Sequence, residues 1–409
     1  MVSVKKAFAL AAILLTAVCG YSEDLKWVDE ALSRAAENYT VLLKNSTVDY
    51  TKEAPFPKRF QDGKLVFCKD WDWCSGFFQG SLWYLYENTK DDKWRAAAEK
   101  YCAEQAHIRT SNLHHDLGFM FIPSAWHAYR LTGNMYYKQV FYDAARTLCT
   151  RWRAKPKAIQ AWGIWGGKWG DSCSVIVDCM LNLEMFMIAG TNPAKADDGM
   201  VHDFLEGGAF LDMAEAHAET TVKYLIRPDG SSYHMAFLDF KTGDLVKRLD
   251  GQGVGHWSRG QGWVIYGFPM MYEYSKDPRW LEVAMRVADY HINEKNLPSD
   301  GIPYWDYEAP NIPNEPRDTS AAAIIGCGLL KLSRICPDKV KSAKYRAEAL
   351  RIAKSLSSDA YFAKPTEIGG FILKHAVGSK PHGAEVDVPL NYGDYYYLEL
   401  LTAIKNTVK

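Results

Sequence analysis

The chain has 409 residues, of which 48% are hydrophobic and 24% are charged, a balance that indicates a globular protein and excludes an intrinsically disordered one. Its formal net charge is −1 and it carries no basic run, so a broad nucleic-acid-binding surface is not expected. Aromatic residues make up 13% of the chain. Aromatic side chains fill hydrophobic cores, but they also stack on sugar rings, so both uses have to be weighed along the sequence.

Residues 1–20 are predicted to be a secretory signal peptide. Two lysines precede an apolar run of 12 residues at 7–18, which is shorter than the about 20 residues that a membrane-spanning helix needs. Cleavage after Gly20 would remove two lysines and no acid, giving a net charge of −3. Cys19 offers the alternative of a lipid-anchored N-terminus. No other stretch reads as a transmembrane span, so we expect an exported protein, periplasmic or held at the outer membrane by a lipid.

The rest of the chain is dominated by predicted amphipathic helices, recognised by apolar residues at spacings of three and four. We expect twelve of them, over residues 23–44, 75–89, 91–109, 117–132, 134–152, 173–190, 203–226, 258–275, 278–294, 318–335, 341–358 and 391–406. Short polar turns at 89–94, 132–136 and 275–280 join helices that must then run antiparallel. Longer links alternate with these turns, over 45–74, 153–172, 227–257, 295–317 and 359–390.

Twelve helices in six hairpins, with the long links gathered at one end, describe an all-α (α/α)6 barrel. The length alone suggests roughly two to three domains. No linker rich in Pro, Gly or Ser divides the chain, however, so residues 21–409 are predicted to form a single domain. One small β excursion is expected, with strands around 231–234 and 237–240 and a turn at 241–244.

The cysteines do not form the pattern of a small disulfide scaffold. Cys68 and Cys74 flank a loop and are the pair best placed for a disulfide. Neither a CxxC nor an HExxH motif is present, so we predict no metal ion and no other cofactor.

The segment Leu113–Phe119, with the sequence LHHDLGF, carries the first candidate for chemistry. Asp116 directly precedes an apolar helix, so it is a candidate N-cap, which is a structural role. The two adjacent histidines and the position on a long link also favour contact with a ligand. The two roles are compatible.

The predicted helix 173–190 carries the second candidate. It is apolar on nearly all sides, which indicates burial. Ser174, Asp178 and Asn182 are four residues apart and would form one polar stripe on it. Desolvation of Asp178 would favour its protonated form near neutral pH, as a general acid requires. The alternative is a buried aspartate satisfied by hydrogen bonds from a neighbouring loop.

Arg259 lies in the segment GHWSRGQGW, which opens another apolar helix. An arginine there could hold a carboxylate with two parallel hydrogen bonds, or it could form a structural ion pair. Trp257 and Trp263 on either side offer flat apolar faces. Several tryptophans on the links, together with two aspartates and this arginine, favour a binding site for an acidic sugar. The loop at 374–382 is either a solvated turn or, through Lys380, a contact for a sulfate or another acidic group.

Taken together, these segments resemble the unsaturated glucuronyl hydrolases, glycoside hydrolase family 88. The resemblance extends from about Trp27 to Leu401. The matching pieces, in chain order, are DWDWCSGFFQGSLWYLYE, HHDLGF, IQAWG, VDCMLNL, DGSSYH, WSRGQGWVIYGFPM, GIPYWDYEAP, RDTSAAAI and GDYYYLELL. Nine pieces in the same order make the resemblance specific.

The resemblance implies hydration of the C4=C5 double bond of a 4,5-unsaturated glucuronic acid at the non-reducing end of an oligosaccharide produced by a polysaccharide lyase. The resulting hemiketal opens and the remaining sugars are released. Asp178 corresponds to the catalytic acid and base, and Asp116 to a second essential carboxylate that contacts sugar hydroxyls and tunes the first. The resemblance assigns the sugar pocket to Trp73, His115, Trp162, His234, Gln252, Trp257, Arg259 and Trp263.

Three other functions would fit parts of this pattern. An unsaturated rhamnogalacturonyl hydrolase would use the same barrel and chemistry on pectin fragments, but HHDLGF and WSRGQGW favour the glucuronyl branch. A sugar epimerase or isomerase on this barrel would need histidine bases rather than the pair Asp116 and Asp178. A non-catalytic glycan-binding surface protein would explain the tryptophans but not an aspartate on a buried helix. Gly378 and His375 stand where relatives with sulfated substrates have hydroxyl residues, so sulfate is not an assured feature of the substrate.

Overall fold

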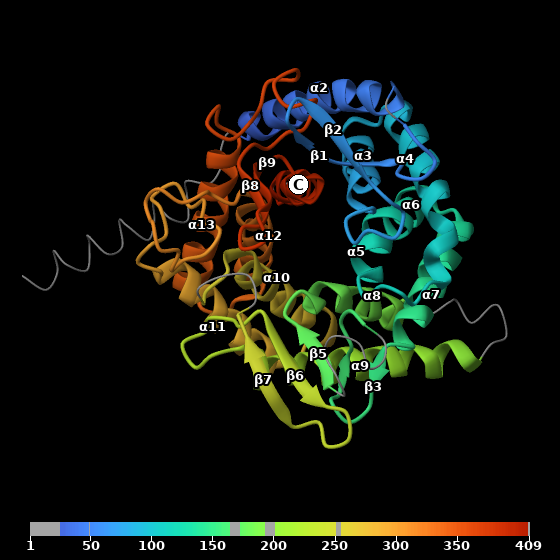
Figure 1. The fold of residues 1–409 in the computed structure, drawn as a ribbon, viewed down its shortest axis with the longest axis vertical. Helices are drawn as coiled ribbons and strands as arrows, with labels where there is room; N and C mark the ends of the chain where they lie inside the picture. The colour runs from blue at the N-terminus through green and yellow to red at the C-terminus, as the bar shows by residue number, and fades with distance from the viewer. Residues whose placement is uncertain (1–24, 49, 164–171, 193–200, 251–254, 408–409) are drawn as a thin grey trace, which may run out of the picture.

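A computed structural model describes residues 25–48, 50–163, 172–192, 201–250 and 255–407 (Figure 1). The predicted signal peptide at 1–20, with Cys19, and the predicted sugar contact Gln252 lie outside the described residues. Among the described helices there is none with the length and apolar character needed to cross a bilayer.

Twelve helical segments among the described residues form two concentric rings around a central axis (Figure 1). The inner ring consists of α3 (Phe77–Thr89), the α5–α6 segment, α8 (Cys179–Thr191), α10 (Ser258–Ser275), α12 (Thr319–Ile335) and α14 (Asn391–Lys405). Each inner helix contacts the next, and α14 returns to α3 to close the ring. The α5–α6 segment is one continuous run, in which the π-helical turn Ile122–Trp126 joins α5 (Leu117–Phe121) to α6 (His127–Thr132).

The outer ring consists of α2 (Lys26–Val48), α4 (Asp92–Gln105), α7 (Met135–Cys149), α9 (Val201–Leu225), α11 (Pro278–Asn293) and α13 (Lys339–Leu356). These helices bury one face and expose the other, whereas α8 and α12 are buried on nearly all sides. Each outer helix packs on the inner layer, which is the (α/α)6 arrangement that the sequence predicts. Helix α4 is shorter than the helix predicted over 91–109, because the chain continues after Gln105 as a 3₁₀ turn at Ala106–Thr110.

The short turns are built as their sequences predict. Asp91, Asn134 and Asp277 accept hydrogen bonds from backbone N–H groups of the first turns of α4, α7 and α11 and so cap these helices. The preceding helices end in left-handed residues, of which one is Gly133 with φ +70°. Trp280, which follows the last of these turns, stacks on Phe268 of the preceding helix α10 with ring centroids 6.1 Å apart.

Short strands occupy the long links rather than the barrel wall. Two hairpins come from β1 (Phe56–Gln61) with β2 (Lys64–Cys68), and from β8 (Ala376–Ser379) with β9 (Ala384–Val388). A smaller one pairs β3 (Trp152–Arg153) with β4 (Ala158–Ile159). A three-stranded antiparallel sheet has the order β5 (Ser172–Ile176), β6 (Met235–Asp239), β7 (Leu245–Leu249). The predicted turn at 241–244 is confirmed, but the strand that follows it, rather than 231–234, is the hairpin partner.

The prediction of a helix over 173–190 is wrong in its first part. Residues Ser172–Ile176 form β5, which pairs with β6, and α8 begins only at Cys179. A short apolar run fits a buried strand as well as a buried helix, and the partner strand lies about sixty residues away, so spacing alone could not choose. Ser174, Asp178 and Asn182 therefore do not form a stripe on one helix. Asp178 is instead the N-cap residue of α8, at the junction of strand and helix.

The predicted disulfide is not formed in the structure, where Cys68 and Cys74 are free, buried thiols. Their sulfur atoms nevertheless lie within 4.8 Å of one another. The Sγ atom of Cys74 donates a hydrogen bond to Oδ1 of Asp72, 2.9 Å away, and this contact holds the loop that carries Trp73.

Candidate active site

The long links converge on a cavity of about 230 Å³, a volume that suits one pyranose ring. Its lining combines aromatic faces with titratable side chains, and consists of Trp73, His114, His115, Asp116, Phe119, Trp162, Ile176, Asp178, His234, Trp257, Arg259, Gly378, Ser379, Glu385 and Tyr392. Eight of the residues named from the sequence as catalytic or sugar-contacting line this cavity, and because they are spread along the chain from Trp73 to Arg259, only the closed barrel brings them together. A larger hollow of about 480 Å³ beside α11 contains none of them.

Asp178 presents one free carboxylate oxygen to this cavity. Its Oδ1 atom accepts a hydrogen bond from the indole N–H of Trp263 at 3.1 Å, which fixes the carboxylate plane. Its Oδ2 atom is buried and has no hydrogen-bond partner among the described residues; its near neighbour is Nε2 of His234, 3.5 Å away. A buried acceptor without a partner is costly, so this oxygen is placed for a group on a ligand.

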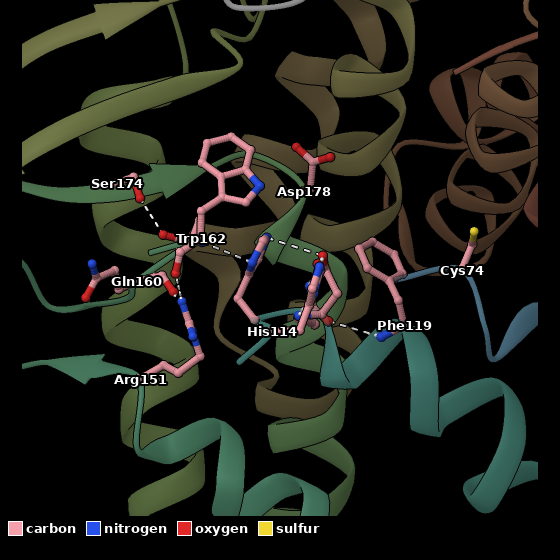
Figure 2. A network of polar contacts seen from close by, with 12 residues as sticks. Cys74, His114, Phe119, Arg151, Gln160, Trp162, Ser174 and Asp178 are labelled. Carbon is pink, nitrogen blue, oxygen red and sulfur yellow. Dashed lines mark hydrogen bonds and ion pairs between the residues drawn. The ribbon is translucent and has the colours of Figure 1, made fainter. Parts of the chain in front are cut away.

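Asp116 stands at the N-terminus of α5, but its side chain does not cap that helix. Asn182 performs this task, because its Oδ1 atom accepts a hydrogen bond from the Phe119 N–H at 3.1 Å. The amide of Asn182 at the same time donates to Oδ1 of Asp116 at 2.8 Å. Of the two roles that the sequence left open for Asp116, the structure therefore supports the one directed at the cavity. Figure 2 shows part of this polar network, with His114, Phe119, Trp162 and Asp178 labelled.

The electrostatic environment keeps Asp116 ionised. Burial by itself raises the pKa of Asp116, but His115, His114 and Asn182 together lower it more, and the pKa falls to about 2. The Oδ2 atom lies 3.1 Å from Nδ1 of His114 and 3.3 Å from Nε2 of His115. At neutral pH Asp116 is a charged group that can accept hydrogen bonds but cannot donate a proton.

His115 is the neutral partner of this carboxylate. It is 1% exposed, and burial lowers its pKa to about 4 despite the neighbouring charge of Asp116. Its Nδ1 atom accepts a hydrogen bond from the Trp162 N–H at 3.2 Å, so the ring proton resides on Nε2. That N–H faces Asp116 without the alignment of a hydrogen bond, and remains available to a ligand in the cavity.

Trp162 is held in an unusual backbone conformation at the edge of the cavity. Its φ angle is +50°, a left-handed value that residues other than glycine rarely adopt. Arg151, which is buried, donates to the carbonyl oxygens of Gln160 and Trp162 in this loop (Figure 2). It also donates to the carbonyl oxygen of Asn112, on the link before α5, and so ties the two segments together. Ser174 of β5 bonds the carbonyl of Ala161, the preceding residue. The conformation is thus fixed by surrounding hydrogen bonds, as expected of a strained residue at a functional site.

Arg259 does not have the free fork that a two-point carboxylate clamp needs. Its Nη1 atom forms a buried ion pair with Asp318 at 3.1 Å and also donates to the carbonyl of Val377, and its Nη2 atom donates to the carbonyl of Gly378 at 2.7 Å. The guanidinium also lies over the ring of Trp257, 4.6 Å from its centroid. Only Nε is buried without a partner among the described residues. The sequence left a structural ion pair and a contact in the cavity as alternatives for Arg259. The structure contains the ion pair and leaves one N–H group, that of Nε, for a contact in the cavity.

The aromatic residues divide into sugar-facing rings and supporting rings. Trp73, Trp162 and Trp257 line the cavity as predicted. Trp263 is fully buried and is not among the residues that line the cavity, but it donates a hydrogen bond to Asp178, so its predicted contact with the sugar stays a prediction. Lys380 is not among the lining residues either; it follows Ser379 in the turn between β8 and β9.

Five buried polar atoms without a hydrogen-bond partner among the described residues belong to cavity-lining side chains. They are Nε2 of His115, Oδ2 of Asp178, Nδ1 of His234, Nε of Arg259 and the hydroxyl of Tyr392. Buried polar atoms are nearly always satisfied in folded proteins. Such a concentration in one cavity indicates a polar ligand with both donors and acceptors.

Sequence reasoning missed several residues of the site. Arg151 lies at the end of a predicted helix, and no motif around it indicates hydrogen bonds to the link at 160–162. Tyr392 and Phe119 belong to apolar helix patterns that read as core. Glu385 lies in a link without any motif. Asn182 enters the prediction only through its spacing from Asp178, as part of a polar stripe that the structure does not contain.

Among the described residues, one group in the cavity has ligand atoms close enough to one another to be considered as a metal site. These atoms belong to His114, His115 and Asp116 and lie within 4.8 Å of one another. His114 and Asp116 already pair with each other, and Nδ1 of His115 is occupied by the Trp162 N–H. This arrangement leaves only one nitrogen of His115 open. The prediction that no metal is needed stays a prediction.

The geometry defines a glycan-processing site in an (α/α)6 barrel, with two carboxylates and aromatic walls. The family model of Glycosyl Hydrolase Family 88 matches residues 51–399. The chain belongs to this family of glycoside hydrolases.

Individual relatives agree with this assignment. The unsaturated glucuronyl hydrolase of Formosa agariphila is 35% identical over 341 residues, which are 82% of this chain and 81% of that protein. A crystal structure of an unsaturated glucuronyl hydrolase specific for heparin has 36% identity and a TM-score of 0.84, and covers 94% of this chain and 98% of its own. A variant enzyme of Streptococcus agalactiae complexed with dGlcA-GalNAc6S has 26% identity and a TM-score of 0.73, and covers 92% and 91% of the two chains.

Proposed function

We propose that the protein is an unsaturated glucuronyl hydrolase that removes the 4,5-unsaturated glucuronic acid from the non-reducing end of glycosaminoglycan-type oligosaccharides produced by lyases. The observation that carries this proposal is the free Oδ2 atom of Asp178 in a sugar-sized cavity beside the ionised Asp116. The family membership and the relatives at 35% and 36% identity support it.

Asp178 is the residue that moves protons in this proposal. Its Oδ2 atom delivers a proton to C4 and takes one from the water that adds to C5, so that hydrogen and hydroxyl add across the double bond. The product is a hemiketal at C5, which opens by breaking the bond between C5 and the ring oxygen. The hemiacetal that remains at C1 then releases the rest of the oligosaccharide. The rule that relates carboxylate separation to retention or inversion does not apply, because the anomeric bond breaks only after the ring opens.

The neighbouring groups bind and orient the sugar. Trp263 fixes the Asp178 carboxylate, and His234 lies beside its reacting oxygen. Asp116 accepts hydrogen bonds from sugar hydroxyls, and the N–H groups of His115 and Arg259 face the cavity as donors. Gln252, which lies outside the described residues, is proposed as a further sugar contact.

The decisive assay follows the ultraviolet absorbance of the conjugated double bond in lyase-generated disaccharides. We expect the absorbance to decay with the wild-type protein, and Asp178→Asn to abolish this decay while leaving the circular dichroism spectrum and Tm unchanged. Asp359→Asn is the matched control, since its carboxylate is 95% exposed and remote from the cavity. A near wild-type rate for Asp178→Asn would remove that residue from its catalytic role.

An unsaturated rhamnogalacturonyl hydrolase is the other activity that this chemistry allows. The relatives carry glucuronyl names, and this favours the glycosaminoglycan substrate. Pectin-derived unsaturated disaccharides belong in the same assay as a second substrate set. Decay with the pectin set alone would reverse the assignment, and no decay with either set would overturn both.

We also propose that the protein acts outside the cytoplasm, as a single domain formed by residues 21–409. The support is the predicted signal peptide at 1–20. Cell fractionation of the native host should place the protein in the periplasm, or with the outer membrane if Cys19 is lipidated. Cys19→Ser should release the protein from the membrane fraction only in the second case. Recovery in the cytoplasm would refute export.

A further inference from the structure

The hydroxyl of Tyr392 has no part in the mechanism described above. Tyr392 lies in the first turn of α14 and lines the cavity, and its side chain is fully buried. Its hydroxyl has no hydrogen-bond partner among the described residues. Burial raises the pKa of Tyr392 above its ordinary value, so the hydroxyl keeps its proton at neutral pH and can donate it in a hydrogen bond. A buried hydroxyl that bonds to nothing costs free energy of folding, which points to a ligand as its partner.

Neighbouring side chains fix the ring of Tyr392. Its centroid lies 4.7 Å from that of Trp73 and 6.1 Å from that of Phe77, and the guanidinium of Arg259 lies 5.4 Å from it. Such close packing restricts the rotation of a buried aromatic side chain. The hydroxyl is therefore a donor held in one direction, which is what the recognition of one particular group on a ligand requires.

Arg259 provides a second unpartnered donor beside Tyr392. Its Nε atom is buried without a partner among the described residues, whereas Nη1 and Nη2 are occupied by Asp318 and by the two β8 carbonyls. The charge of Arg259 is already balanced by Asp318, so this arginine alone offers an anion one N–H group and no free fork. An anion bound here needs a donor from another residue to complete its hydrogen bonds.

We propose that Tyr392 is a substrate-binding residue, whose hydroxyl donates a hydrogen bond to the carboxylate of the unsaturated uronic acid next to Nε of Arg259. The inference rests on the proposed function, which places C4 of the sugar at Asp178. The carboxylate is attached to C5, the neighbour of C4, so it has to be bound in the same cavity. The two buried histidines of the cavity already face Asp116 and Asp178. Tyr392 and Arg259 are then the unpartnered donors that no catalytic carboxylate faces among the described residues.

The test measures the binding of an unsaturated disaccharide and of its carboxamide, in which a neutral amide replaces the uronate carboxylate. Asp178→Asn serves as the background, so that both compounds bind without turnover and isothermal titration calorimetry gives their Kd values. Adding Tyr392→Phe should raise Kd for the carboxylate at least about tenfold and Kd for the amide about threefold or less, because a hydrogen bond to a charged acceptor is the stronger one. In the wild-type background, Tyr392→Phe should raise KM and leave kcat nearly unchanged.

Tyr397→Phe is the matched control. Tyr397 lies on the same helix and is also fully buried, but it does not line the cavity, and its hydroxyl lies 2.7 Å from Oγ of Ser357 in a hydrogen bond. Its substitution should lower Tm, because this hydrogen bond is lost, and should leave both Kd values unchanged. Tyr392→Phe should do the reverse, since the hydroxyl that it removes has no partner among the described residues.

The outcomes separate the two proposals. No turnover of any unsaturated disaccharide by the wild-type protein overturns the proposed function and this inference with it. Turnover by the wild-type protein, with a Kd for the carboxylate that Tyr392→Phe leaves unchanged, overturns the inference alone. An equal rise in Kd for the carboxylate and the amide also overturns it, since the hydroxyl would then contact another part of the sugar. A loss of Tm as large as that of Tyr397→Phe would assign the hydroxyl a structural hydrogen bond instead.

Discussion

The ion pair between Arg259 and Asp318 joins the barrel to the cavity wall, and its removal should cost more stability than any surface pair. Asp318 is fully buried. Its Oδ1 atom caps α12 by accepting the N–H groups of Ser320 and Ala321, while Oδ2 faces Arg259. Asp318→Asn can retain the cap but leaves the arginine buried without its counter-charge. Breaking such a pair from one side costs about 3–5 kcal/mol.

The expected change in Tm follows from the size of the chain. At about 2.1 cal/mol/K per residue, the unfolding entropy is about 0.8 kcal/mol/K, so a loss of about 3 kcal/mol lowers Tm by about 4 °C. Differential scanning calorimetry measures this directly. The control is Glu206→Gln, which breaks the exposed pair of Glu206 with Arg146 and should change Tm by about 1 °C or less.

The same substitution should also affect the cavity. Arg259 holds the carbonyl oxygens of Val377 and Gly378, so Asp318→Asn should also reduce kcat/KM for the unsaturated disaccharide. Equal Tm values for Asp318→Asn and the Glu206→Gln control would refute the view that burial makes this pair special.

Three other predictions test the site and its support. Asn182→Asp keeps an acceptor for α5 but sets a carboxylate against Asp116, so kcat/KM should fall and its acidic limb should move to higher pH; an unchanged pH–rate profile would contradict this. Gly118→Ala should lower the free energy of unfolding by about 1–3 kcal/mol in a denaturant titration, because its Cβ would lie 2.5 Å from the Asn182 backbone, whereas Gly208→Ala on open helix surface should be neutral or stabilising. Burial lowers the pKa of His217 to about 3 in the folded chain, against about 6.5 in the unfolded chain, so the unfolded chain takes up a proton first and stability falls as the pH drops from 6.5 toward 3. His217→Gln should therefore make Tm fall less steeply between about pH 7 and 5. An unaltered slope of Tm against pH would refute this prediction.

The comparison of His217→Gln with the parent protein is needed because another buried group acts in the opposite sense. Burial raises the pKa of Asp394 to about 7. The folded chain therefore holds a proton on Asp394 between about pH 4 and 7 that the unfolded chain lacks, and this contribution stabilises the protein as the pH falls through that window. Only the difference between the two proteins isolates the histidine.

Much of the barrel is readable from the sequence because its determinants are local. Helices such as α10 and α12 are marked by their apolar runs, and the tight turns by capping residues such as Asp277 that act within one turn of their own helix. The segment before Asp178 is the instructive exception. Its residues suit a strand or a helix, and β6, which decides the matter, lies far along the chain.

The site shows the same division. The sequence by itself singled out Asp116, Asp178, Trp162 and Arg259, because charged and aromatic residues on apolar elements need an explanation. Only the tertiary structure decided what each of them does, since hydrogen bonds such as Asn182 to Asp116 and Arg259 to the β8 carbonyls join segments at least 66 residues apart. Contacts between distant segments leave no periodic pattern in the chain. They exist only once the ring of helices has closed and excluded water from the space between them.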